Sequence, residues 1–183
     1  MPALARKVET AVTNAVTTQF TSLAADNRPE PRTPFDFALR DLLDDLFAAQ
    51  PTWATHIGFH AYDDRWPDMT EAGRHARVTM VDRHRAAVQA LDDASLADEE
   101  KIDCGIVLEA LDAIEFEETD LREPAWNPLS YVLLAGGGFF GLLAREFAPW
   151  EHRGAAFVGR LQGLPALLES GADALAGADD RPV

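Results

Sequence analysis

The chain has 183 residues, of which 47% are hydrophobic, and this length fits one domain that can bury most of its apolar surface. Its 31 acidic and 16 basic residues give a formal net charge of −15, which repels phosphate backbones and anionic lipid headgroups. Because there is a single cysteine, Cys104, and neither a secretory leader nor a stretch near the roughly 18 apolar residues of a membrane span, we expect a cytoplasmic protein that binds neither nucleic acid nor membranes.

The first part of the chain, residues 1–33, is expected to form an appended helix and a linker. Apolar residues recur there at helical spacing, and residues 27–34 are rich in proline. The repeat consists of Leu4, Val8, Val12 and Val16. The helical domain itself is then expected to occupy residues 34–183.

The clearest helix begins after Thr33, which is a good N-cap residue and is followed by Pro34 at the first helical position. Apolar residues continue at steps of three and four as far as Phe47. A short helix from Trp53 to Ile57 is expected next, and Gly58 is expected to end it.

Two longer helices are predicted beyond an ordered loop at residues 59–69. Thr70 is expected to cap the first, whose apolar stripe includes His84. The second is expected to open at Ser95. Its broad apolar surface indicates a central helix with neighbours on more than one side.

The last third of the chain alternates apolar runs with helix-breaking residues. The triplet at residues 136–138 lacks the Lys-Ser or Lys-Thr of a phosphate loop, so it is predicted to interrupt a helix. Pro165 lies inside the final helical pattern and predicts a kink. Since no segment alternates like a strand, we expect an all-α antiparallel bundle of about six to eight helices with a kinked C-terminal helix.

Histidine spacing offers weak evidence for a metal site. His56 and His60 are four residues apart, but no Glu follows His56 as in zinc proteases. The histidine spacing leaves one alternative function, a small metal-dependent hydrolase that uses His60 with His56 or His75. The simpler expectation is that His60 forms a hydrogen bond within its loop, to Asp63 or Asp64.

Asp103 lies on the apolar stripe of its predicted helix, where an unpaired carboxylate would cost several kcal/mol. We therefore expect Asp103 to be buried against His84, Arg83 or Arg85 as a structural pair. The acidic residues at 115–118 are expected to form a solvated face. No nucleophile motif is present, so no catalytic residue and no metal ligand is assigned.

A family resemblance follows from the segment at residues 51–69. Ala54-Thr55 precedes Gly58, His60, Tyr62-Asp63 and Pro67-Asp68, and this order resembles the opening signature of domain-of-unknown-function family 885. Asn127-Pro128 and residues 160–168 extend the resemblance over residues 34–176. Full family members are much longer and carry a His-Glu-x-x-Pro-Gly-His-His element, typical of helical zinc metallopeptidases, which this chain lacks.

The resemblance implies a non-catalytic N-terminal helical lobe that forms a scaffold or one wall of a substrate cleft. Zinc is then expected only in full-length members, and the expected partner is the catalytic C-terminal half. It also implies an exposed apolar docking surface around residues 136–147. The alternative is a stand-alone interaction module that forms a homodimer. The candidate binding residues all come from the loop: His60, Tyr62, Asp63, Asp64, Trp66 and Asp68.

Overall fold

The computed structural model describes residues 28–176, and this part of the chain contains six α-helices and no strand. The all-α prediction is confirmed. The appended helix expected near the N-terminus lies outside the described residues. The helices are α2 (Pro34–Ala49), α3 (Pro51–Ile57), α4 (Glu71–Gln89), α5 (Asp98–Phe116), α6 (Leu129–Ala144) and α7 (Trp150–Ala176), the last of which contains Pro165.

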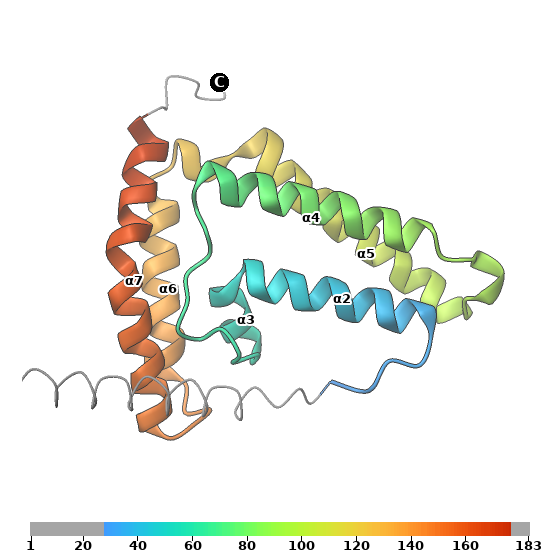
Figure 1. Ribbon diagram of the computed structural model, residues 1–183, viewed down its shortest axis with the longest axis horizontal. Helices are drawn as coiled ribbons and strands as arrows, with labels where there is room; N and C mark the ends of the chain where they lie inside the picture. The colour runs from blue at the N-terminus through green and yellow to red at the C-terminus, as the bar shows by residue number, and fades with distance from the viewer. Residues whose placement is uncertain (1–27, 177–183) are drawn as a thin grey trace, which may run out of the picture.

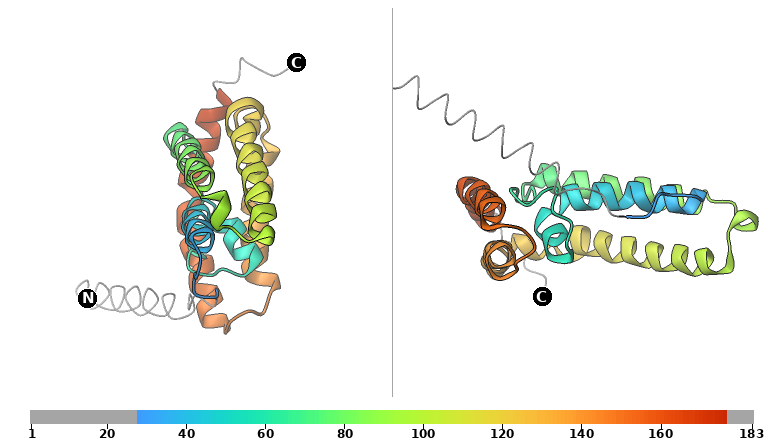
Figure 2. Two further views of the ribbon diagram at one scale, coloured as in Figure 1. Left: turned by 90° about the vertical axis from the view of Figure 1, so that its right-hand side faces the viewer. Right: turned by 90° about the horizontal axis from the view of Figure 1, so that it is seen from below.

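The helices form two groups (Figure 1). In the first group α4 and α5 are antiparallel neighbours, and α2 packs along α4. In the second group α6 and α7 form an antiparallel pair at one end of the molecule, as Figure 2 shows. The chain bends by 102° between α5 and α6, so the second group lies across the first. The short helix α3 packs against both α2 and α6 and so joins the two groups.

The core of the first group lies between α2, α4 and α5. It consists of Leu42, Met80, Val81 and Leu111. Leu111 is the only residue of α5 that is fully buried, since the principal helical neighbour of α5 is α4. The prediction of a central helix with neighbours on several sides is therefore wrong for α5, and Ile102 and Ile106 are exposed.

Local capping signals explain where several helices begin and end. The Thr33 side chain accepts a hydrogen bond from the Asp36 N–H at 3.1 Å, and the Thr70 side chain accepts one from the Gly73 N–H at 3.1 Å. Helix α3 ends at Gly58, whose φ of 98° is in the left-handed region that favours glycine. These three predictions are confirmed.

Ser95 does not begin α5. Its hydroxyl donates to the carbonyl of Asp92 at 2.7 Å within a 3₁₀ turn at Asp93–Ser95. The helix starts at Asp98 instead, where the Glu100 carboxylate accepts a hydrogen bond from the Ala97 N–H. Within the described residues no single helix is long and apolar enough to cross a membrane, and only the bent pair Asp98–Ala125 and Leu129–Ala144 meets those criteria jointly.

The cap of α4 provides a direct test of this local structure. Thr70→Ala removes an acceptor from the Gly73 N–H and a donor to the Asp68 carboxylate. We expect the free energy of unfolding to fall by about 1 kcal/mol in urea denaturation, as for other N-caps. Thr79→Ala is the matched control, because Thr79 lies in the interior of α4 and its hydroxyl donates only to the His75 carbonyl. Equal losses in the two variants would contradict a capping role for Thr70.

Candidate functional site

The loop between α3 and α4 is anchored to the protein interior by Asp63. This side chain is 1% exposed, and its Oδ1 accepts a hydrogen bond from the Thr55 hydroxyl at 2.6 Å. Its Oδ2 lies 2.9 Å from His60 Nδ1, so the expected hydrogen bond between His60 and Asp63 is confirmed. The His60 ring also stacks on Phe147 with 3.7 Å between ring centroids.

Arg160 of α7 is the second buried charge beneath this loop. Its side chain is fully buried and donates hydrogen bonds to four acceptors on three other parts of the chain. They are the Thr55 hydroxyl at 2.6 Å, the carbonyls of Arg65 at 3.2 Å and Pro51 at 3.5 Å, and the carbonyl of Gly138. Arg160 therefore connects α3, the loop and α6 to α7.

The Thr55 hydroxyl lies between the two buried charges, since it accepts from Arg160 and donates to Asp63. Burial lowers the pKa of the Arg160 guanidinium to about 10, while the carboxylates of Asp63 and Asp64 act in the opposite direction. At neutral pH Arg160 thus remains charged. We call Asp63, Thr55, Arg160 and His60 the buried polar network.

Trp66 attaches the loop to both α6 and α7. Its indole N–H donates to the Arg160 carbonyl at 2.7 Å, and its ring meets Phe139 edge-on at 5.3 Å. A Cβ atom added to Gly138 would lie 2.5 Å from the indole, and one added to Gly163 would lie 3.0 Å from it. The prediction that the glycine triplet interrupts a helix is wrong, because α6 continues through it and Gly138 makes room for Trp66.

The six candidate binding residues do not form one surface. His60, Asp63 and Trp66 are turned inward, where they brace the loop. Tyr62 is half-buried, with the Arg65 guanidinium 5.2 Å from its ring, and Asp64 lies 3.6 Å from the same arginine. Their role in binding stays a prediction.

Asp68, the sixth of these residues, is exposed and belongs to the start of α4. Its Oδ1 accepts hydrogen bonds from the Thr70 hydroxyl at 2.6 Å and the Thr70 N–H at 3.0 Å. The hydroxyl hydrogen bond is the main reason why the pKa of Asp68 is lowered. Asp68 therefore helps to position a helix terminus.

The histidines proposed as metal ligands are not brought together. His56 is exposed, His60 is bonded to Asp63, and His75 lies 3.7 Å from Glu71 on its own helix. Across residues 28–176 no three His, Cys, Asp or Glu side chains are grouped so that they could hold a metal ion. The side chains in this part of the chain therefore do not fit a zinc ion.

The predicted pairing of Asp103 is wrong. Asp103 is exposed, because it lies with Ile102 and Ile106 on a face of α5 that no helix among residues 28–176 covers. His84 is buried at 4% exposure, but its Nε2 lies 2.7 Å from the Asp45 carboxylate on α2. The histidine thus pairs with a residue 39 positions away in the sequence.

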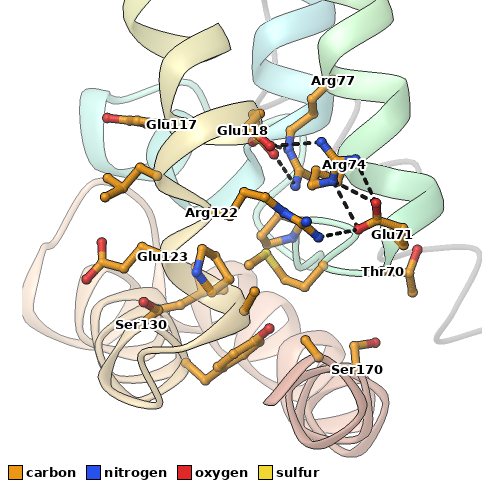
Figure 3. A pocket seen from close by; sticks show the side chains of 18 of the residues that line it. Thr70, Glu71, Arg74, Arg77, Glu117, Glu118, Arg122, Glu123, Ser130 and Ser170 are labelled. Carbon is orange, nitrogen blue, oxygen red and sulfur yellow. Dashed lines mark hydrogen bonds and ion pairs between the residues drawn. The ribbon is translucent and has the colours of Figure 1, made fainter. Parts of the chain in front are cut away.

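A pocket of about 650 Å³ opens between the start of α4, the turns after α5, and the α6–α7 pair (Figure 3). Three arginines line it together with their acidic partners. Arg74 lies 2.6 Å from Glu71, Arg122 lies 3.3 Å from Glu71, and Arg77 Nη2 donates to Glu118 at 3.0 Å. The expectation of a wholly solvated acidic face is wrong for Glu118, whose side chain is 14% exposed.

Helix α6 presents an apolar face that no described residue covers. Leu129, Val132, Leu133, Phe140 and Leu143 are 48–71% exposed and recur at helical spacing. Gly136 and Gly137 lie on the same face, and added Cβ atoms there would meet nothing within 4 Å. We call these seven residues the α6 stripe. The apolar surface expected around residues 136–147 is present, although it begins earlier, at Leu129.

Comparisons with known proteins concern the family and the fold of the chain. The sequence profile of a family described as "Bacterial protein of unknown function (DUF885)" matches residues 51–182. No curated protein matches the chain. A solved structure from Shewanella oneidensis, described as a candidate lipoprotein of unknown function, is similar with 27% identity and a TM-score of 0.70. The similarity covers 78% of this chain and 26% of that one, so the chain spans about a quarter of the length of that protein.

Proposed function

Because this chain belongs to the bacterial family DUF885, we propose that it serves as the N-terminal helical lobe of a zinc-metallopeptidase-like protein. In this proposal the lobe is not catalytic itself. It acts as a scaffold and as one wall of a substrate cleft, and the zinc and the reacting groups belong to a larger second part.

The α6 stripe is the observation that carries the proposal. Exposed apolar patches of this kind mark surfaces that bind another protein surface. Burial of a large apolar side chain contributes about 1.5–3 kcal/mol, so five such side chains would support a stable interface. Gly136 and Gly137 at its centre leave room for the backbone of a partner helix.

The occupant that we propose is a polypeptide equivalent to the remainder of the longer relative. The similar solved structure has about three-quarters of its length outside the part that this chain matches. The buried polar network fits this role, because it fixes α3 and the loop to α6 and α7. A docking face on α6 would then be held rigidly relative to the loop, which in this proposal forms part of the wall of the substrate cleft.

A second copy of this chain is the alternative occupant. The two adjacent glycines of the stripe would let two α6 helices approach closely, which favours a symmetric pair. Sedimentation velocity separates the alternatives. A stable homodimer of the isolated chain that persists when the larger protein is added would favour the stand-alone interaction module over the N-terminal lobe.

The proposal is tested by isolating the native protein from its own cells with an antibody to this chain. We expect either one longer polypeptide or a 20.0 kDa chain in a stoichiometric complex with a larger protein, with about one zinc ion in each case. A 20.0 kDa species without zinc and without a larger protein would contradict the lobe. The cytoplasmic location stays a prediction, and cell fractionation of the same material tests it.

The docking face is tested with Phe140→Glu. A carboxylate at this 68% exposed position should not affect folding, but burying it against an apolar partner is costly. When the 20.0 kDa chain and the larger protein are separate polypeptides, the larger protein should therefore no longer co-purify. Ile102→Glu is the matched control, because Ile102 is 65% exposed and lies on α5. Co-purification that survives Phe140→Glu, or that Ile102→Glu removes equally, would rule out α6 as the docking face.

A further inference from the structure

We propose that the pocket between α4, the turns after α5, α6 and α7 binds a small monocarboxylate with an apolar body, and that Arg122 and Tyr131 receive its carboxylate. The cavity of about 650 Å³ is in the size range of small-molecule sites. The pocket shares only Leu133 with the α6 stripe, and the proposal does not rest on the proposed function.

The hydroxyl of Tyr131 is the first observation. Tyr131 lines the pocket and is 4% exposed, and its hydroxyl has no hydrogen-bond partner among residues 28–176. Nearly all buried polar groups in proteins have a partner. The ring is held tightly, since a Cβ atom added to Gly171 would lie 2.9 Å from it. The hydroxyl oxygen is itself buried, and a ligand acceptor that reaches it from the pocket would give this donor the partner that it lacks.

The backbone around Arg122 is the second observation. Arg122 has a φ of 44°, which is unusual for a residue other than glycine, and it directly follows a π-helical turn at Glu117–Leu121. Such irregular backbone is concentrated at functional sites. Here it directs the guanidinium across the pocket towards Glu71, as Figure 3 shows.

The three arginines of the pocket differ in how many donors remain open. Arg74 makes several hydrogen bonds to the Glu71 carboxylate, and Arg77 pairs with Glu118 through both Nε and Nη2. The Arg122 guanidinium has only one contact within the described part of the chain, from Nη2 to Glu71 at 3.3 Å. Arg122 therefore offers further N–H donors to an anion.

The charge and polarity of the walls narrow the ligand class. One open guanidinium and one neutral hydroxyl suit a single negative charge. The five carboxylates of the lining outnumber its three guanidinium groups, and the resulting net negative charge disfavours a dianion such as phosphate more strongly than a monoanion. Glu117 and Glu123 point away from the ion pairs in Figure 3. The remaining lining is largely apolar and includes Met69 and Leu134, which would contact an apolar body.

The test is titration calorimetry of the whole chain with N-acetyl-leucine and with its uncharged amide. We expect N-acetyl-leucine to bind, and the amide, Arg122→Gln and Tyr131→Phe each to weaken binding about tenfold. Arg83→Gln is the matched control, since Arg83 is a 61% exposed arginine paired with Asp45 outside the pocket, and it should bind as the wild type does. N-acetyl-Ala-Ala-Leu is the third probe. Tighter binding of this peptide would identify the carboxyl end of a peptide as the source of the carboxylate, and equal binding would identify a free acid.

Stability measurements separate a ligand role from a structural role. Because the Tyr131 hydroxyl has no partner, Tyr131→Phe should leave the Tm of the ligand-free chain unchanged or raise it. Equal binding of the acid and the amide, tighter binding of inorganic phosphate, or no binding of any probe would overturn the proposal. A lower Tm in Tyr131→Phe with unchanged affinity would also overturn it.

Discussion

Replacing Arg160 by methionine is expected to lower the free energy of unfolding by about 3–5 kcal/mol, the range found when one member of a buried charged pair is removed. Methionine fills a similar volume but donates no hydrogen bond. The Thr55 hydroxyl and the Gly138 carbonyl would lose a buried donor, and the Asp63 carboxylate would lose its nearby positive charge. Urea denaturation at neutral pH measures the loss.

Arg160 affects the free energy of unfolding in two opposite ways. Burial of its charge destabilises the folded chain, whereas its hydrogen bonds stabilise it. Its folded-state pKa of about 10 is lower than its usual value, chiefly because burial disfavours the charged form. Above pH 10 the unfolded chain therefore holds more protons than the folded chain, and the contribution of this group to stability rises with pH there. At neutral pH methionine would remove that burial cost, but it would also leave several acceptors unpaired at about 1–3 kcal/mol each. We expect the unpaired acceptors to dominate.

Arg83→Met is the control for this substitution. Arg83 is 61% exposed in its pair with Asp45, and exposed pairs contribute at most about 1 kcal/mol. A loss in Arg160→Met as small as that of Arg83→Met would mean that the burial cost and the hydrogen bonds cancel. The buried polar network would then hold the loop in place without stabilising the fold.

Alanine substitutions at two neighbouring glycines of α6 are expected to have opposite effects. Gly138→Ala should lower the free energy of unfolding by about 1–3 kcal/mol, as overpacking of a core does. Its new Cβ would lie 2.5 Å from the Trp66 ring and 3.2 Å from a methyl carbon of Thr52. The indole cannot retreat easily, because its N–H is bonded to the Arg160 carbonyl at 2.7 Å.

Gly136→Ala should instead raise the free energy of unfolding by about 0.5–1 kcal/mol. An added Cβ there meets nothing within 4 Å, and alanine loses less conformational entropy than glycine when it enters a helix. Parallel urea denaturation of the two variants measures both effects. If both substitutions raised the free energy of unfolding, the result would contradict the close packing of Trp66 against Gly138.

The motif in the loop between α3 and α4 predicted the family of the chain, but not which of its side chains are buried. The order of Gly58, His60, Asp63 and Asp68 pointed to the family, and the profile match over residues 51–182 established membership. The same residues were candidates for a binding surface. Three-dimensional packing assigns His60 and Asp63 to the interior, because their partners Thr55 and Phe147 come from different helices or loops.

One of the pocket residues, Arg77, carries a weak signal in the sequence. Arg77 precedes Val81 and His84 at steps of four and three, which places it on the buried face of α4. A charged residue on such a face requires a partner, and that partner is Glu118, 41 positions later. The spacing identifies the buried arginine, but not the carboxylate that pairs with it. Nothing in the sequence pointed to the unpaired Tyr131 hydroxyl.

Properties that depend on neighbouring residues follow from the amino-acid sequence alone. Caps at Thr33 and Thr70, the stop at Gly58 and the all-α character all follow from local hydrogen bonds, backbone freedom and apolar periodicity, which act within a few residues. The exposure of Asp103, the burial of Arg160 and the continuation of α6 through Gly138 depend instead on three-dimensional packing. Those outcomes depend on which helix faces which, and the 102° bend between α5 and α6 sets that arrangement through contacts between residues far apart in the sequence.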